Sequence, residues 1–202
     1  MEPDITTAIE RWFAEHAEEE NGDFVRADRL TPYFVIPPLV SSRKVVYTTK
    51  SHGMVAAVAK SESSTDFGVI GRHGLPCESD VAWIHDIVGT RSLWFLGDLD
   101  PADLLIFAWL RARVAPQAVQ HLGVSDRFLQ TLWIEATDRL LIRMAPSERD
   151  ALPLLDIALP DWRTLVGARC TDLLQAGRKF EVEAAMHGPH GVAGLLLPLA
   201  ND

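Results

Sequence analysis

Cysteine is scarce in this chain of 202 residues, which contains only Cys77 and Cys170. Two cysteines supply neither a disulfide framework nor the ligand spacing of a zinc site, which is typical of a reducing compartment. No hydrophobic run is long enough to cross a bilayer, and the acidic N-terminal residues lack the apolar core of an export signal. We therefore expect a cytoplasmic protein that has no membrane partner.

Positive charge is also in short supply, with 19 Lys and Arg against 28 Asp and Glu and a net charge of −9. Residues 1–23 hold eight acids and one base, so that −7 of this charge lies there and only −2 on the rest of the chain. This balance argues against tight non-specific binding to nucleic acid. The nearly neutral remainder still leaves room for a local basic groove.

The apolar pattern predicts an α/β fold. Residues 4–21 are expected to form an amphipathic helix whose acidic face could dock a protein partner, and residues 24–43 to form an irregular connector. Beyond them, strand and helix patterns alternate four times, which predicts a Rossmann-like, mainly parallel sheet of about four strands with helices on both faces. The predicted strands span residues 44–49, 67–71, 93–96 and 117–122, and the predicted helices between and after them include residues 51–61, 79–88 and a long helix from Pro101 to before Pro116.

The C-terminal third is predicted to be mainly helical. Residues 178–187 are expected to form its last helix, and the apolar tail a closing edge strand. The chain then divides into three parts: an N-terminal helix and connector over residues 1–43, an α/β core over residues 44–126, and a helical extension over residues 127–202.

The sequence GDLDP joins the third predicted strand to its helix. Asp98 and Asp100 thus follow the carboxyl end of a buried strand, where open α/β sheets bind ligands. Carboxylate oxygens are the ligands that Mg²⁺ and Mn²⁺ prefer, so the two aspartates are candidate metal ligands. Asp100 before Pro101 also suits a helix N-cap, with Asp103 close to the capping-box position. That structural role alone leaves Asp98 unexplained.

Polar residues follow the other predicted strands as well. Because the carboxyl ends of parallel strands meet at one edge of the sheet, these residues are expected near the two aspartates. Lys50, Arg72 and His73 are candidates to bind phosphate oxygens, and Thr49 and Asp126 are possible accessory residues. The alternative stays open that these cations and the histidine are solvated loop residues, which is the commoner fate of such side chains.

The strand, GDLDP and helix together resemble the DxD motif of Toprim domains, found in topoisomerases, bacterial primases and related nucleases. The chain resembles most the Toprim nuclease subunit of bacterial anti-plasmid systems built around SMC-like complexes; the A subunit of topoisomerase VI and the meiotic double-strand-break proteins are more distant. The matching features are Lys50, the VIGRHG loop, WFLGDLDP, Asp126 and the KFEVE segment with Glu181 and Glu183. This resemblance spans residues 44–187 and implies a Toprim fold, a Mg²⁺ or Mn²⁺ site and phosphodiester chemistry on DNA, with Glu181 as a further accessory residue.

One departure from the family pattern bears on catalysis. The family's first strand ends in a glutamate that acts as general acid/base or holds metal, whereas Thr48 or Thr49 stands here. A threonine hydroxyl does not ionise near neutral pH and is a poor proton shuttle. Another acid could substitute for the glutamate, the candidates being Glu62, Glu78 and Glu181.

Two hypotheses about function follow. The first is a Mg²⁺-binding protein of DNA processing or defence that cleaves phosphodiester bonds. The second is a catalytically degenerate Toprim domain that acts as an interaction or assembly module. An unrelated nucleotide-binding Rossmann domain is less favoured because no glycine-rich phosphate loop follows the first strand.

Overall fold

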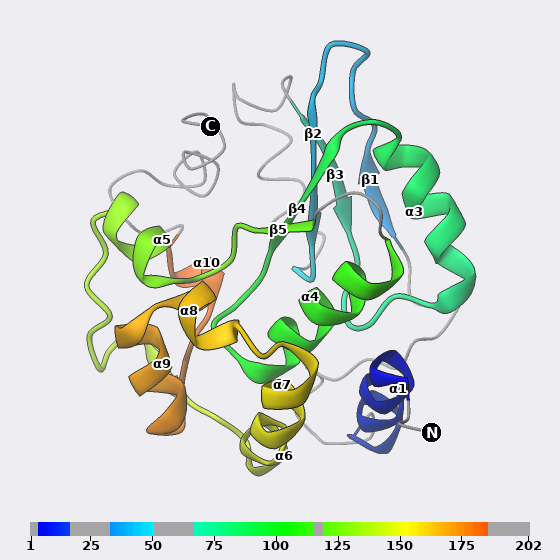
Figure 1. Cartoon of the computed structure of the whole chain (residues 1–202). Coiled ribbons are helices and arrows are strands. Elements are labelled where there is room, and N and C mark those ends of the chain that lie inside the picture. Colours follow the sequence, from blue (N-terminus) through cyan, green and yellow to red (C-terminus); the bar gives the residue numbers. More distant parts are fainter. Residues whose placement is uncertain (1–3, 17–32, 51–66, 115–118, 186–202) are drawn as a thin grey trace.

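The computed structural model describes residues 4–16, 33–50, 67–114 and 119–185 (Figure 1). Five strands form one sheet in the order β1-β3-β2-β4-β5. Four of them run parallel, and β1 pairs antiparallel with β3 at one edge. The α/β class with a mostly parallel sheet is therefore confirmed. The strands are β1 (Phe34–Ile36), β2 (Lys44–Thr48), β3 (Phe67–Gly71), β4 (Ser92–Leu96) and β5 (Val119–His121).

The four parallel strands are those that the sequence predicts, while β1 lies inside the segment predicted to be irregular. This edge strand has three residues and is followed at once by Pro37 and Pro38, so its apolar pattern is too short to be recognised. Gly68 of β3 lets Pro38 pack against the sheet, because a Cβ on Gly68 would lie 2.8 Å from the proline ring.

The helices of the described ranges agree with the prediction in most places. The helix predicted over residues 51–61 and the edge strand predicted in the apolar C-terminal tail lie outside the described residues. The prediction that helices cover both faces of the sheet therefore stays a prediction. None of the described helices is both long enough and apolar enough to cross a lipid bilayer. The helices are α1 (Ile5–His16), α3 (Val81–Val88), α4 (Pro101–Arg113), α5 (Asp126–Thr131), α6 (Pro146–Asp150), α7 (Leu152–Ala158), α8 (Trp162–Val166), α9 (Ala168–Gln175) and α10 (Val182–Ala185).

Helix α4 is the buried centre of the fold. Every residue from Pro101 to Leu110 is buried, because α4 contacts α1, α6 and α7 as well as β5. The amphipathic helix α1 covers α4 and α7 with its apolar side, and the Trp109 indole N–H donates to Glu10 Oε1 at 2.8 Å (Figure 1). The apolar face of α1 is thus covered by the chain itself, which explains why α4 is apolar on all sides.

A second, two-stranded sheet was not predicted in the C-terminal part, which was expected to be mainly helical. Strand β6 (Leu141–Arg143) pairs antiparallel with β7 (Arg178–Phe180), so the helix predicted over residues 178–187 is wrong at its start and survives only as α10. The backbone of Phe180 also pairs with Leu99, whose N–H donates to the Phe180 carbonyl at 2.9 Å. This second sheet therefore holds the loop between Asp98 and Asp100, and a long-range pairing outweighs local helix preference.

Candidate functional site

The ends of β2 and β4 flank the point where the strand order of the sheet reverses. The chain runs from β2 to β3 on one side and then returns past β2 to β4 on the other. Thr48 pairs with Leu96 at the carboxyl ends of the two strands, so the residues that follow them are neighbours. Crevices at such switch points are where open α/β sheets bind ligands.

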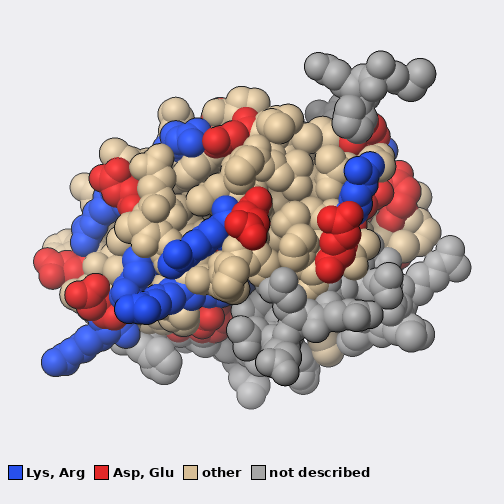
Figure 2. Space-filling model, turned by 90° about the horizontal axis from the view of Figure 1, so that it is seen from below, with Lys and Arg blue, Asp and Glu red and all other residues tan. Residues whose placement is uncertain are grey.

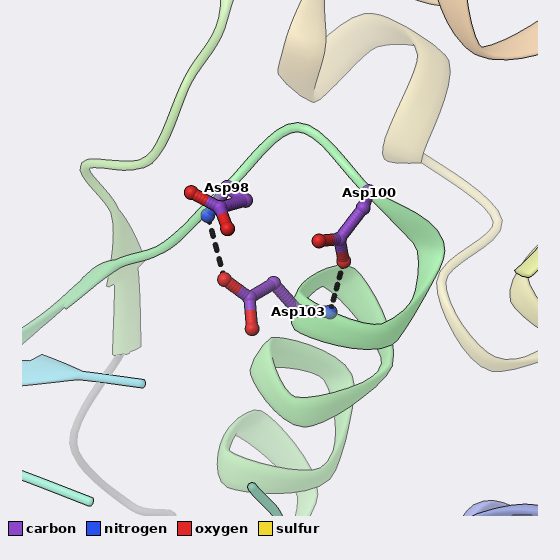
Figure 3. A group of neighbouring side chains, drawn as sticks. All are labelled: Asp98, Asp100 and Asp103. Atoms are coloured by element: carbon purple, nitrogen blue, oxygen red, sulfur yellow. Dashed lines mark hydrogen bonds between the residues drawn. The ribbon is translucent and has the colours of Figure 1, made fainter. Parts of the chain in front are cut away.

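Three aspartates converge at this point (Figure 3). Asp98, Asp100 and Asp103 are all buried, and each offers a carboxylate oxygen within 4.8 Å of the others. Asp100 caps α4, since its Oδ1 accepts the Asp103 N–H at 2.7 Å. The cap and the metal-ligand interpretations of Asp100 are thus compatible in one geometry.

Asp103 is the member of this cluster that the sequence suggested only as a capping residue. Its Oδ2 accepts the Asp98 N–H at 2.6 Å and the Thr49 hydroxyl at 2.8 Å, which ties α4 to the ends of both strands. Gly97 makes this possible, because a Cβ there would lie 2.6 Å from Asp103 Oδ2. The available signal was its place in the first turn of α4, where side chains point back toward the helix N-terminus.

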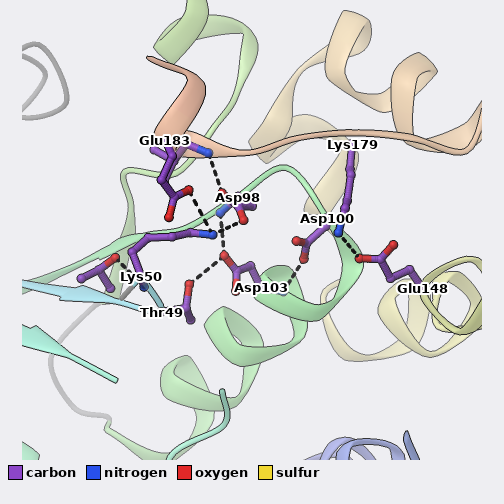
Figure 4. Close-up of polar contacts among 10 residues, drawn as sticks. Thr49, Lys50, Asp98, Asp100, Asp103, Glu148, Lys179 and Glu183 are labelled. Carbon is purple, nitrogen blue, oxygen red and sulfur yellow. Dashed lines mark hydrogen bonds and ion pairs between the residues drawn. The ribbon is translucent and has the colours of Figure 1, made fainter. Parts of the chain in front are cut away.

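Asp98 is held on both oxygens (Figure 4). The Lys50 ammonium donates to Oδ2, and the Val182 N–H donates to Oδ1. Lys50 Nζ also lies 3.5 Å from Glu183 Oε2. The side chains of Lys50 and Asp98 are 13% and 7% exposed, so this ion pair is largely screened from water.

Burial and like charge raise the pKa values of the aspartates. Burial raises the pKa of Asp98 well above its ordinary value, with Lys50 opposing the shift, and burial together with Asp100 raises the pKa of Asp103 to about 6. Burial opposes the charged form of Lys50, but Asp98, Asp103 and Glu183 outweigh it and raise its pKa. The raised pKa of Lys50 favours its ammonium, whereas the raised pKa of Asp98 favours its neutral acid. The contacts favour the ionised pair, because both oxygens of Asp98 accept hydrogen bonds.

A cavity of about 210 Å³ opens beside the three aspartates, and the C-terminal part of the chain supplies much of its wall. There Lys179 Nζ pairs with Glu148 Oε1 at 2.7 Å, and Glu148 Oε2 accepts the Ala145 N–H at 2.6 Å. Glu148 was not among the predicted site residues, and Lys179 was noted only as the first residue of the KFEVE segment. The charged and polar side chains of the wall are Thr49, Lys50, His73, Asp98, Asp100, Asp103, Glu148, Lys179, Glu181 and Glu183.

Most of the predicted site residues thus line one cavity, but Arg72 and Asp126 do not. Arg72 is 1% exposed, donates from Nε to the Leu75 carbonyl at 3.1 Å and lies over the Tyr33 ring. Its predicted phosphate contact therefore finds no support in this geometry, because its guanidinium is engaged inside the fold.

Asp126 serves helix α9 instead of the cavity. Its two carboxylate oxygens accept the N–H groups of Arg169 at 3.0 Å and Cys170 at 2.9 Å, in the first turn of α9. This is a capping arrangement in which an acid from another element satisfies free N–H groups.

Within the described ranges, threonines and no carboxylate stand directly at the end of β2, where the glutamate was expected. Thr48 Oγ1 accepts the Lys50 N–H at 3.2 Å, and the Thr49 hydroxyl is bound to Asp103. Of the possible substitutes, Glu181 lines the cavity, whereas Glu78 pairs with Arg113 at 3.1 Å and is absent from the cavity wall. Glu62 lies outside the described residues.

The donor set fits a hard divalent cation. Asp98, Asp100 and Asp103 each offer one carboxylate oxygen, and these oxygens lie within 4.8 Å of one another. Mg²⁺ is commonly bound by one or two carboxylates with waters completing its octahedron, which this geometry allows.

Comparison with known proteins finds no family model that matches the chain and no similar curated protein.

Proposed function

We propose that the chain is a Toprim-like protein of DNA processing or defence that binds Mg²⁺ or Mn²⁺ through Asp98, Asp100 and Asp103. The observation that carries this proposal is the convergence of three buried carboxylates at the switch point of a mostly parallel sheet. Burying three like charges is costly unless a cation balances them. A structural role alone explains the cap made by Asp100 but not the whole cluster.

The negative charge of the cavity means that a phosphate-bearing substrate would need a bound metal ion. Its wall carries six carboxylates against two lysines, so a phosphate group alone would be repelled there. A bound divalent ion would polarise a phosphoryl oxygen and activate a bound water for attack on a phosphodiester bond. His73 is exposed and belongs to the cavity wall, which supports the proposal that it contacts a phosphate.

The described part of the surface seen in Figure 2 is of mixed charge. Figure 2 shows basic and acidic side chains interspersed over the described part of the face seen from below. Several of the arginines are paired, among them Arg111 with Asp161 and Arg163 with Asp156. Any affinity for DNA would therefore depend on the metal centre more than on a basic band.

A second candidate function is an interaction or assembly module that has lost catalysis. Two observations favour it: threonines stand where the family has its glutamate, and Lys50 already neutralises Asp98. The predicted docking of a protein partner by the acidic N-terminal helix stays a prediction, since only residues 4–16 of that segment are described.

Nicking of supercoiled plasmid in the presence of Mn²⁺ separates the two candidates. We expect the wild-type protein to nick the plasmid, and Asp103→Asn and EDTA to abolish the activity. Asp126→Asn is the matched control, because it removes a carboxylate outside the cavity and should nick normally.

Three other results would decide against catalysis or against the metal site. Equal nicking by wild type and Asp103→Asn would identify a contaminant. A melting temperature that rises with Mn²⁺ without any nicking would favour the assembly module. A melting temperature that Mn²⁺ leaves unchanged would contradict the metal site itself.

A further inference from the structure

We propose that Lys50 is a tethered counterion that competes with divalent metal ions for the aspartate cluster. In this view the ammonium of Lys50 neutralises the carboxylates when no metal is bound, and an entering ion must displace it. The inference rests on the proposed function because it concerns the same cluster. It goes further by naming the residue that sets the affinity and occupancy of the site.

The geometry places the ammonium where a cation would be bound. Lys50 Nζ contacts one oxygen of Asp98 and lies 3.5 Å from Glu183 Oε2, so it already bridges two carboxylates of the cavity wall (Figure 4). Its side chain is 13% exposed, which means that the charge is held inside the site and not in solvent. An ion that binds Asp98 through Oδ2 would meet this ammonium directly.

The other lysine of the cavity makes a different contact. Lys179 Nζ contacts Glu148 at 2.7 Å, on the side of the cavity formed by α6 and β7. The Lys50 ammonium contacts Asp98 itself. Replacing Lys179 changes the net charge of the cavity by the same amount without freeing Asp98, which makes it a matched control.

Like charges at short range repel strongly in a partly buried site, so a resident ammonium weakens the binding of a second cation. Removing it should leave Asp98 with a free oxygen and one more uncompensated negative charge in the cluster. Both changes favour a divalent ion, whose two charges then replace the single charge of the lysine.

The experiment measures Mn²⁺ binding to the full chain by electron paramagnetic resonance or calorimetry. We expect Lys50→Met and Lys50→Gln to bind Mn²⁺ about tenfold more tightly than wild type, and Lys179→Met to differ from wild type by less than about threefold. Lys50→Gln retains an N–H donor for Asp98 and guards against misfolding of the Met variant. A Lys50→Met chain that folds only with Mn²⁺ present also supports the proposal, because the ion then supplies the missing charge.

Each remaining outcome is informative. If wild type fails to bind Mn²⁺ but the Lys50 variants bind it, the counterion role stands and the proposed metal function of the wild-type chain fails. If wild type binds Mn²⁺ and the Lys50 variants bind no more tightly, the counterion role is overturned and the proposed function stands. An equal gain in Mn²⁺ affinity in Lys179→Met would show that only the net charge of the cavity matters, and it would overturn the specific role of Lys50. Absence of binding in every protein would contradict both proposals.

Discussion

Asp100 shows how one side chain serves both the fold and the site. Its Oδ1 caps α4 through the Asp103 N–H, and its carboxylate also belongs to the aspartate cluster. Asparagine caps a helix as well as aspartate does, but it is a weaker ligand for Mg²⁺. The two roles can therefore be separated by substitution.

We expect Asp100→Asn to unfold in EDTA with a free energy equal to or above that of wild type, because it keeps the cap and removes a repelling charge. Asp100→Ala should be less stable than Asp100→Asn by about 1 kcal/mol, the usual loss of an N-cap. Both variants should lose Mn²⁺ affinity. Urea denaturation in EDTA with a parallel Mn²⁺ titration checks this, and a variant that loses the cap but keeps full affinity would limit Asp100 to a structural role.

His121 at the end of β5 is a half-buried residue whose Nε2 lies inside the fold, so its charge state affects stability. Its ring stacks on Phe95 and meets the edge of Phe107, and its Nε2 has no hydrogen-bond partner within the described residues. Burial lowers the pKa of His121 to about 4, against 6.5 for the unfolded chain. Between these values the unfolded chain binds a proton that the folded chain does not, so stability falls as the pH is lowered from about 6.5 to about 4.

His121→Leu removes this titration. We expect the free energy of unfolding of the variant, relative to wild type, to rise by up to about 3 kcal/mol between pH 7 and pH 4. Taking the difference between the two proteins cancels the opposite contribution of Asp103, whose pKa of about 6 favours the folded state at low pH. A difference that stays constant with pH would mean that His121 is not held neutral.

At the scale of elements, the start of α9 depends on a residue from another helix. The carboxylate of Asp126 accepts two N–H groups of α9, and Gly167 before that helix has φ +90°. A Cβ on Gly167 would lie 2.5 Å from Asp126 Oδ2, so only a residue without a side chain leaves room for this carboxylate.

Asp126→Ala should lower the free energy of unfolding by about 1–2 kcal/mol, and Asp126→Asn by much less, because the amide oxygen still accepts a hydrogen bond. Mn²⁺ affinity should be unchanged in both, since Asp126 does not line the cavity. Denaturation curves and Mn²⁺ titrations of the two variants check these expectations. A loss of metal affinity would return Asp126 to the accessory role that the sequence suggested.

Some strands could be predicted from the residues that form them, whereas others could not, because they depend on pairing with distant segments. Strands β2 and β3 have five residues each, with β-branched side chains at their centres, and β3 ends in Gly71. Strands β1, β6 and β7 have three residues each, and they exist through pairing with distant segments. A pattern read along the chain contains no information on such pairings until the fold is known.

In the whole molecule, some residues of the candidate site could be predicted from a local motif, whereas others reach it only through long-range pairing. Asp98 and Asp100 were predictable because a strand, a glycine and a helix start lie within a few residues. Glu148 and Lys179 reach the cavity only because the second sheet pairs with Leu99 and brings the C-terminal part against the end of β4. The candidate centre is therefore built by two parts of the chain, of which GDLDP carried the clearer motif and KFEVE the weaker one.

The proposed metal centre requires a cation that binds between the aspartates. A crystal of the wild-type protein soaked in Mn²⁺ tests this most directly. We predict an anomalous peak about 2 Å from carboxylate oxygens of at least two of Asp98, Asp100 and Asp103. A map with no peak at this position, in which Lys50 still contacts Asp98, would contradict the metal centre.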